Sequence, residues 1–99
     1  MSKSAVSTSE IFEKAVSILT QCGAKRIAVF GSYARGDFEE GSDLDILVEF
    51  SETKSLLELV QIERELSEAL GIKVDLLTER AISPYLIDRI RGEAKVIYG

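Results

Sequence analysis

Histidine is absent from the 99 residues, and cysteine, proline and methionine occur once each. Without histidine, the chain has no imidazole general base, no Cys/His zinc site and no histidine-centred catalytic triad. The single cysteine, Cys22, cannot form a disulfide within the chain, and its place in an apolar helical pattern favours a small core residue over a reactive thiol. Any catalysis must therefore rest on carboxylates, hydroxyl groups or a hard metal ion.

Long apolar runs and an excess of positive charge are missing as well. No stretch approaches the ~20 apolar residues needed to cross a bilayer, and the polar, serine-rich start of the chain has no apolar segment typical of a signal peptide. With 12 basic against 17 acidic residues, the formal charge of -5 argues against direct binding of nucleic acid. We therefore expect a cytoplasmic protein with no membrane association, in which residues 1–8 form a flexible tail and residues 9–99 a single domain.

Capping residues, a proline and several glycines along the chain predict alternating helices and strands. Ser7 with Glu10, and Ser55 with Glu58, have the spacing of a helix capping box, and Ser83 followed by proline starts a third helix. The expected helices end before Gly23, Gly71 and Gly92, a single helical turn is expected at 32–35, and the expected strands are 26–30, 43–50, 72–78 and 95–98. This order indicates a small α/β or α+β layer in which helices cover a sheet. It leaves open whether the second and third strands are parallel or antiparallel.

Two aspartates interrupt the apolar strand DLDILV. Strand alternation places Asp43 and Asp45 on one face and Leu44, Ile46 and Val48 on the other. Asp75 interrupts the next strand in the same way, so three carboxylates are expected on one patch. Two divalent ions would offset their mutual repulsion, and Mg²⁺ prefers such oxygen ligands. The alternative is a solvated sheet face with no site.

The residues before the acidic strand are candidates for a second part of the site. Gly31 allows close approach of the backbone to a ligand, and Ser32 at the start of a helical turn can bind phosphate oxygens. Alternatively, Gly31 makes a tight turn and Ser32 only caps the helix. Arg35 can reach a phosphate or form an ion pair with Asp37, Glu39 or Glu40.

Together these residues resemble a known family. Phe30-Gly31-Ser32, a gap, and then Asp43-Leu44-Asp45-Ile46 is similar to the signature of the DNA polymerase β nucleotidyltransferase superfamily. The string GSYARGDFEEGSDLD, Asp75 in KVDLLT and the ending RIRGEAKVIYG resemble its smallest branch, the minimal nucleotidyltransferase (MNT) domains. The resemblance covers nearly the whole chain from about Arg26. It implies a polymerase-β-like palm, a small mixed β-sheet flanked by helices.

The resemblance also implies an activity and a partner. MNT domains are commonly paired, as antitoxins, with a helical HEPN toxin, and some transfer AMP from ATP to a tyrosine of that toxin. Gly31 and Ser32 would then hold phosphates, and Asp43 and Asp45 would bind two Mg²⁺ ions. Asp75 would bind one of these ions and assist deprotonation of the acceptor hydroxyl. The alternatives are a binding module that neutralises a toxin without catalysis, and transfer to a small hydroxylated molecule such as an aminoglycoside.

Overall fold

The computed structural model describes residues 8–39, 41–78 and 82–99. The expected capping residue Ser7 and the rest of the expected tail up to residue 7 lie outside these ranges. The elements follow in the order α1 (Thr8–Gln21), β1 (Ala24–Phe30), α2 (Ser32–Arg35), β2 (Leu44–Phe50), α3 (Leu56–Leu70), β3 (Val74–Thr78), α4 (Pro84–Glu93) and β4 (Lys95–Tyr98). The predicted types and order of the elements are confirmed.

Element boundaries differ from the expectation at several ends. β1 begins at Ala24, because this residue pairs with Phe50 across an irregularity in the register, and β3 begins only at Val74. α4 does not end before Gly92, as the sequence predicted, but continues to Glu93. The amide of Ala94 donates to the carbonyl of Ile90 over 2.8 Å, so the last turn closes without a left-handed glycine. A glycine in the last turn therefore does not always mark the end of a helix.

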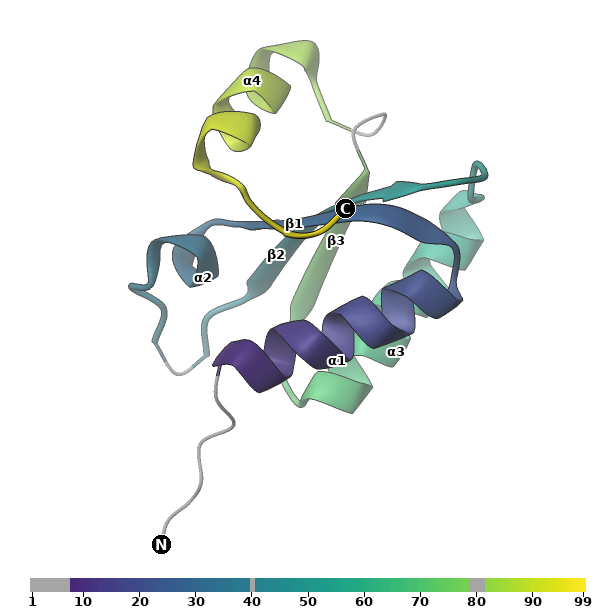
Figure 1. Ribbon diagram of the computed structural model, residues 1–99, viewed down its shortest axis with the longest axis horizontal. Coiled ribbons are helices and arrows are strands. Elements are labelled where there is room, and N and C mark those ends of the chain that lie inside the picture. Colours follow the sequence, from purple (N-terminus) through teal and green to yellow (C-terminus); the bar gives the residue numbers. More distant parts are fainter. Residues whose placement is uncertain (1–7, 40, 79–81) are drawn as a thin grey trace, which may run out of the picture.

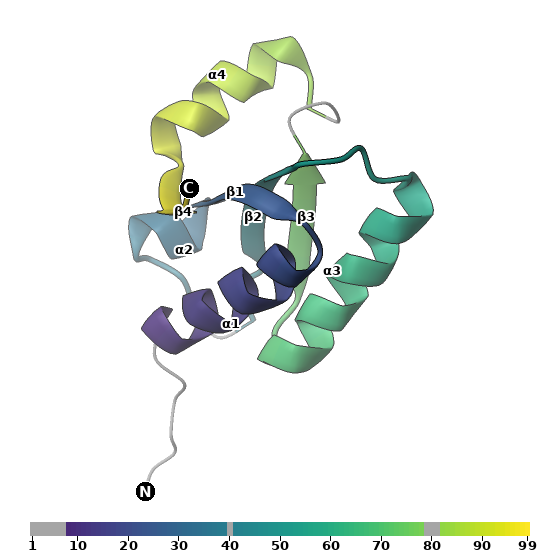
Figure 2. The same ribbon diagram turned by 45° about the vertical axis from the view of Figure 1, so that its right-hand side comes forward.

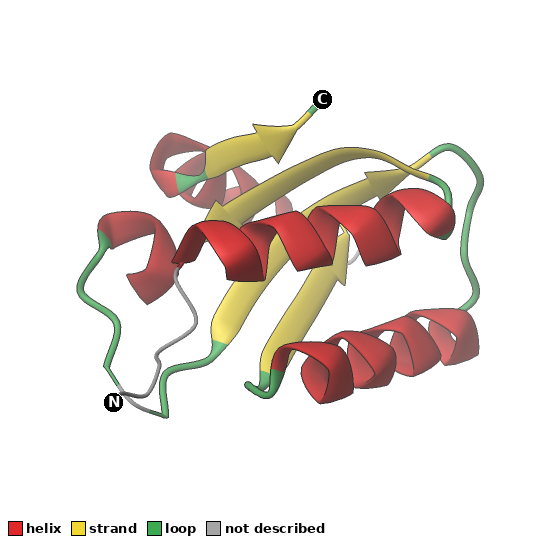
Figure 3. Cartoon of the chain, turned by 60° about the horizontal axis from the view of Figure 1, so that its bottom comes forward, coloured by secondary structure: helices red, strands yellow, loops and turns green. Residues whose placement is uncertain are grey.

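The four strands form one mixed sheet in the order β3-β2-β1-β4. β1 is antiparallel to both β2 and β4, whereas β2 and β3 are parallel (Figure 3). Parallel neighbours need a crossover connection, and α3 supplies it. The structure thus answers the question that the sequence left open, and it confirms that the terminal strand lies at an edge of the sheet.

Helices α1 and α3 cover one face of the sheet, and α4 lies over the other (Figures 1 and 2). The side chains of Leu44, Ile46 and Val48 face α1 and α3 and are at most 1% exposed. Burying an aliphatic side chain of this size contributes about 1.5–3 kcal/mol. The predicted alternation of β2 is confirmed, since burial of these three residues fixes which face its acidic residues must take. Cys22 packs, partly buried, against the same core, as expected.

The two later helices are capped as the sequence predicts. In α3, the amide of Glu58 donates to Ser55 Oγ over 3.2 Å, and the amide of Ser55 donates to Glu58 Oε1 over 2.9 Å, which completes a capping box. In α4, Ser83 Oγ accepts from the amide of Tyr85, and Pro84 follows the cap. No residue of α4 is buried. Within the described part of the chain, none of the helices combines the length and apolar character of a membrane span.

Candidate active site

The sheet register places two of the predicted acids side by side. Asp45 on β2 is the register partner of Asp75 on β3. Neighbouring strands are about 4.8 Å apart, and paired residues of parallel strands point to the same face. Their flanking partners, Leu44 with Val74 and Ile46 with Leu76, point to the buried face. Asp75 therefore shares a face with Asp45, and the two segments meet although a helix separates them in the sequence.

Asp43 lies one residue before β2, at the same end of the sheet. Its carboxylate is 4.0 Å from the ammonium of Lys73, which precedes β3. The pKa of Asp45 is raised above its ordinary value, first by burial and then by the negative charges of Asp75 and Asp43, while Arg35 lowers it. Asp75 and Asp43 are thus near enough to Asp45 to oppose the ionisation of its carboxyl group.

The side chains do not, however, form a ready coordination sphere. Across the residues that the structure describes, no group of three or more Asp, Glu, His or Cys side chains is arranged to hold a metal ion. The donor set itself fits Mg²⁺, because all three groups are hard oxygen ligands and no soft ligand accompanies them. Carboxylates without a cation between them repel one another, so the spread arrangement is the one that electrostatics favours.

Gly31 lies directly against the Asp45 carboxylate. β1 ends at Phe30, the register partner of Asp45, and Gly31 follows with φ 74° and ψ −152°, a conformation essentially restricted to glycine. A Cβ atom at this position would overlap with Asp45 Oδ2. The close approach predicted for this glycine is therefore present, and the group that approaches it is the acid of the neighbouring strand.

Ser32 does not cap α2, which corrects the structural alternative considered for it. The N-cap position is Gly31, and no side chain makes a capping hydrogen bond there. Ser32 is the first residue of the helix, and the turn is closed at the other end by the amide of Gly36, which donates to the Ser32 carbonyl over 2.9 Å. Its hydroxyl is thus not required for capping, and it lies at the start of a helix beside the acids.

Arg35 forms two ion pairs. Its Nε atom lies 3.2 Å from Asp37 Oδ2, and one terminal nitrogen lies 3.6 Å from Glu93 Oε1 at the end of α4. The pair with Asp37 was among the alternatives predicted, whereas Glu40, another of them, lies outside the described residues. Glu93 was missed, because no local sequence signal links α2 to α4. Lys73 was missed for the same reason.

The aromatic residue of α2 is structural. Tyr33 is 7% exposed, and its ring stacks on Phe38 with a centroid separation of 4.2 Å and an interplanar angle of 5°. This stack joins α2 to the loop that leads toward Asp43. The Gly-Ser turn and the acidic strand are therefore connected through packing as well as through sequence.

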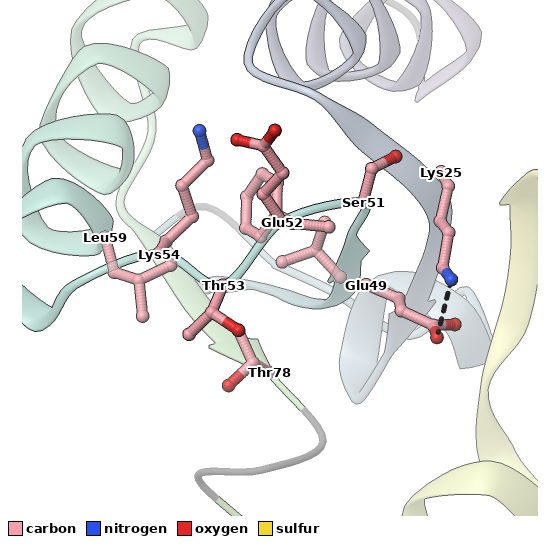
Figure 4. Close-up of a pocket in the computed structure, with 10 residues that line it drawn as sticks. Lys25, Glu49, Ser51, Glu52, Thr53, Lys54, Leu59 and Thr78 are labelled. Atoms are coloured by element: carbon pink, nitrogen blue, oxygen red, sulfur yellow. Dashed lines mark ion pairs between the residues drawn. The ribbon is translucent and has the colours of Figure 1, made fainter.

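A separate hollow of about 600 Å³ lies at the opposite end of the sheet (Figure 4). It is lined by Lys25, Val48, Glu49, Phe50, Ser51, Glu52, Thr53, Lys54, Leu59 and Thr78. Two of its basic side chains have close contacts: Lys25 lies 3.5 Å from Glu49, and the Lys54 ammonium lies 5.5 Å from the centre of the Phe50 ring. The sequence did not predict this hollow, and it contains none of the predicted site residues.

Comparison with known proteins identifies the family of the chain. Residues 9–97 match the family model described as a nucleotidyltransferase domain. A Methanocaldococcus jannaschii protein, provisionally named a protein adenylyltransferase, is 55% identical over 85 residues, which cover 86% of this chain and 91% of the relative. The protein adenylyltransferase MntA of Thermococcus cleftensis is 47% identical over 76 residues, covering 77% of this chain and 75% of that protein.

Solved structures give the same result. A toxin-antitoxin crystal structure with AMP-PNP matches with a TM-score of 0.82 and 28% identity, over 89% of this chain and 73% of that one. The match to the family model extends over nearly all of the described fold, including both acidic strands and the Gly-Ser turn. The chain therefore belongs to the nucleotidyltransferase domain family and has the fold of its minimal members.

Proposed function

We propose that this nucleotidyltransferase transfers AMP from ATP to a tyrosine hydroxyl of a HEPN-type toxin partner and thereby acts as an antitoxin, in a reaction that depends on Mg²⁺. The observation that carries the proposal is the pairing of Asp45 with Asp75 on one sheet face, beside Asp43 and the Gly31-Ser32 turn. Like charges are gathered there at a cost to folding, which is typical of catalytic sites.

In this proposal, Asp43, Asp45 and Asp75 hold two Mg²⁺ ions. When bound, these ions would neutralise the phosphate charge and stabilise the developing charge on the attacking and leaving oxygens. The acidic residues meet the requirement for hard oxygen ligands, and the raised pKa of Asp45, caused by burial and then by the charges of Asp75 and Asp43, supports a cation here. Binding of divalent cations should therefore oppose protonation of this cluster.

The remaining groups of the site would orient the nucleotide. Ser32 and the backbone at Gly31 would hold the β- and γ-phosphates, and Arg35 would leave Asp37 or Glu93 to contact the phosphates. The acceptor oxygen forms a new bond to the α-phosphorus while the bond to the β-phosphate oxygen breaks. Pyrophosphate leaves, and Asp75 assists removal of the acceptor proton.

A partner protein is part of the proposal because the similar proteins point to one. The similar toxin-antitoxin structure holds AMP-PNP, and the curated relatives are named as protein adenylyltransferases. The described chain offers acids and a phosphate-binding turn, while its hollow lies at the other end of the sheet. Recognition of the base and of the acceptor tyrosine would therefore fall largely to surfaces that the toxin supplies.

The test incubates the chain with α-labelled ATP, Mg²⁺ and the HEPN protein encoded beside it. We expect label on the HEPN protein, its loss when EDTA is added, and its loss in the Asp43→Asn/Asp45→Asn variant. Mass spectrometry of the labelled peptide identifies the modified tyrosine. If the double variant still neutralises the toxin in cells and no label is transferred by the unaltered chain, neutralisation occurs by binding alone and the proposal is wrong.

A further inference from the structure

The two strands that carry the paired acids are not supported equally. β2 lies between β1 and β3, so both of its edges are hydrogen-bonded, whereas β3 is the outermost strand of the sheet. The carbonyl of Lys73 accepts from the amide of Leu44 over 2.8 Å, which shows that alternate residues from Lys73 onward turn their backbone toward β2. The amides of Val74 and Leu76 therefore point to the open edge, where no strand pairs with them.

Two side chains of α3 bind these edge amides. The amide of Val74 donates to Ser67 Oγ over 3.1 Å, and the amide of Leu76 donates to Glu63 Oε2 over 2.8 Å. Both contacts are partly buried. Four residues along a helix rise about 6.0 Å and two residues along a strand about 6.6 Å, so the spacing of the acceptors on α3 matches the spacing of the donors on β3.

The two bonded amides stand on either side of Asp75. We propose that Glu63 and Ser67 are positioning residues for the active site: they fix the outer strand so that the Asp75 carboxylate stays level with Asp45. This inference rests on the proposed function. Asp45 needs no such support, because its strand is paired on both sides. The side chains of α3 replace, for the outer strand, the neighbour that the sheet does not provide.

α3 is a suitable anchor because its own ends are fixed. Its first turn is closed by the capping box of Ser55 and Glu58, and its last turn by the amide of Gly71, which donates to the carbonyl of Ser67 over 2.9 Å. Ile62 and Leu66, which neighbour the two acceptors on the helix, are buried in the core. The acceptors are thus carried by a helix that cannot rotate without disturbing the core.

The test uses variants at the two acceptors and a control on the same helix. Glu63→Ala and Ser67→Ala each remove an acceptor, and Glu63→Gln keeps an acceptor oxygen without the charge. Glu68→Ala removes an exposed acid that lies 4.0 Å from Arg64. Hydrogen exchange measures the amides of Val74 and Leu76, and adenylyl transfer to the HEPN protein gives kcat and KM. Circular dichroism confirms that each variant is folded.

In Glu63→Ala we expect faster exchange at Leu76 and a kcat lower by about 10- to 100-fold, the usual effect of removing a group that orients a metal ligand. KM for ATP should change by less than about threefold, because the phosphates are held by the turn before α2. Glu63→Gln should restore most of kcat, and Glu68→Ala should match the unaltered chain. Ser67→Ala should act in the same direction at Val74, and it decides the question if Glu63→Ala does not fold.

Unchanged amide exchange in folded variants would overturn the inference, as would faster exchange with an unchanged kcat, since the bonds would then stabilise the edge and nothing more. Absence of transfer by the unaltered chain is a separate outcome that rejects the proposed function. In that case Mn²⁺ binding to the free chain, measured by titration calorimetry, still tests the positioning role. Affinity should fall in Glu63→Ala and Ser67→Ala but not in Glu68→Ala.

Discussion

The two ends of the sheet differ in how their charges are arranged. At the end with the hollow, Lys25 pairs with Glu49 and Lys54 lies over the Phe50 ring. At the acidic end, Asp45 is beside Asp75 and close to Asp43, and its pKa is raised first by burial and then by these like charges. The hollow therefore lies at the end with an ion pair, and the like charges gather at the other end. In this small fold, a cluster of like charges indicates the candidate active site better than a concave surface does.

The largest expected difference between the two ends is catalytic. Asp45→Asn should lower adenylyl transfer by about 10³-fold or more, because a lost metal ligand removes several kcal/mol of transition-state stabilisation. Lys54→Ala, in the hollow, should leave kcat within about twofold. Both are measured with labelled ATP and the HEPN protein. Similar losses in both variants would show that the hollow belongs to the active site and that the comparison is wrong.

Alanine substitutions at two glycines test the close approach of Gly31 to the Asp45 carboxylate. Gly31 and Gly71 have nearly equal positive φ angles of 74° and 72°, but a Cβ would meet the Asp45 carboxylate at Gly31 and nothing within 4 Å at Gly71. Alanine at either position should cost about 1–3 kcal/mol of stability through backbone strain. Only Gly31→Ala should also lower kcat, by about 100-fold, because displacement of a ligand by about 1 Å misaligns the reacting groups. Equal kcat values in two folded variants would contradict this expectation.

The elevated pKa of Asp45 predicts that the acidic end costs stability at neutral pH. An acid whose folded pKa lies above its ordinary value binds more protons when folded, so stability falls as pH rises between the two values. Without metal, Asp45→Asn should therefore unfold at a higher urea concentration than the unaltered chain at pH 7. The difference should shrink as pH falls below the ordinary value of 3.8. Asp88→Asn, on the exposed side of α4, is the control for loss of one negative charge and should not stabilise.

The smallest expected effect concerns stability at the end with the hollow. Ser55→Ala removes one half of the capping box of α3 and should cost about 1 kcal/mol, measured as a lower urea midpoint. The pKa of Glu58 is lowered by its backbone and side-chain hydrogen bonds with Ser55, and it should return toward its ordinary value in the variant. With saturating substrates, kcat should be unchanged. A loss of kcat without a loss of stability would show that the cap of α3 is itself needed to position Asp75.

Much of the fold could be predicted because its signals are local. Capping residues at Ser55 and Ser83 marked helix starts, and alternation around Asp45 and Asp75 marked which strand face is buried. The motif that contains Gly31 predicted a close approach of the backbone, and the structure places Gly31 against the Asp45 carboxylate. Apart from the shared face of Asp45 and Asp75, relations between distant segments could not be predicted, since no local pattern encodes them. The parallel register of β2 and β3, the ion pair of Arg35 with Glu93, and the bonds from α3 to the edge of β3 belong to this class.

The attachment of α4 to the rest of the fold has a consequence for local unfolding. The helix buries none of its side chains; Glu93 in its last turn forms an ion pair with Arg35, and β4, which follows it, pairs with β1. Apolar burial, the main source of local stability, contributes little along its length. The amide hydrogens of α4 should therefore exchange through a partial unfolding of low free energy, while those of the strands and α1 stay protected. We expect α4 to unfold independently of the rest of the fold.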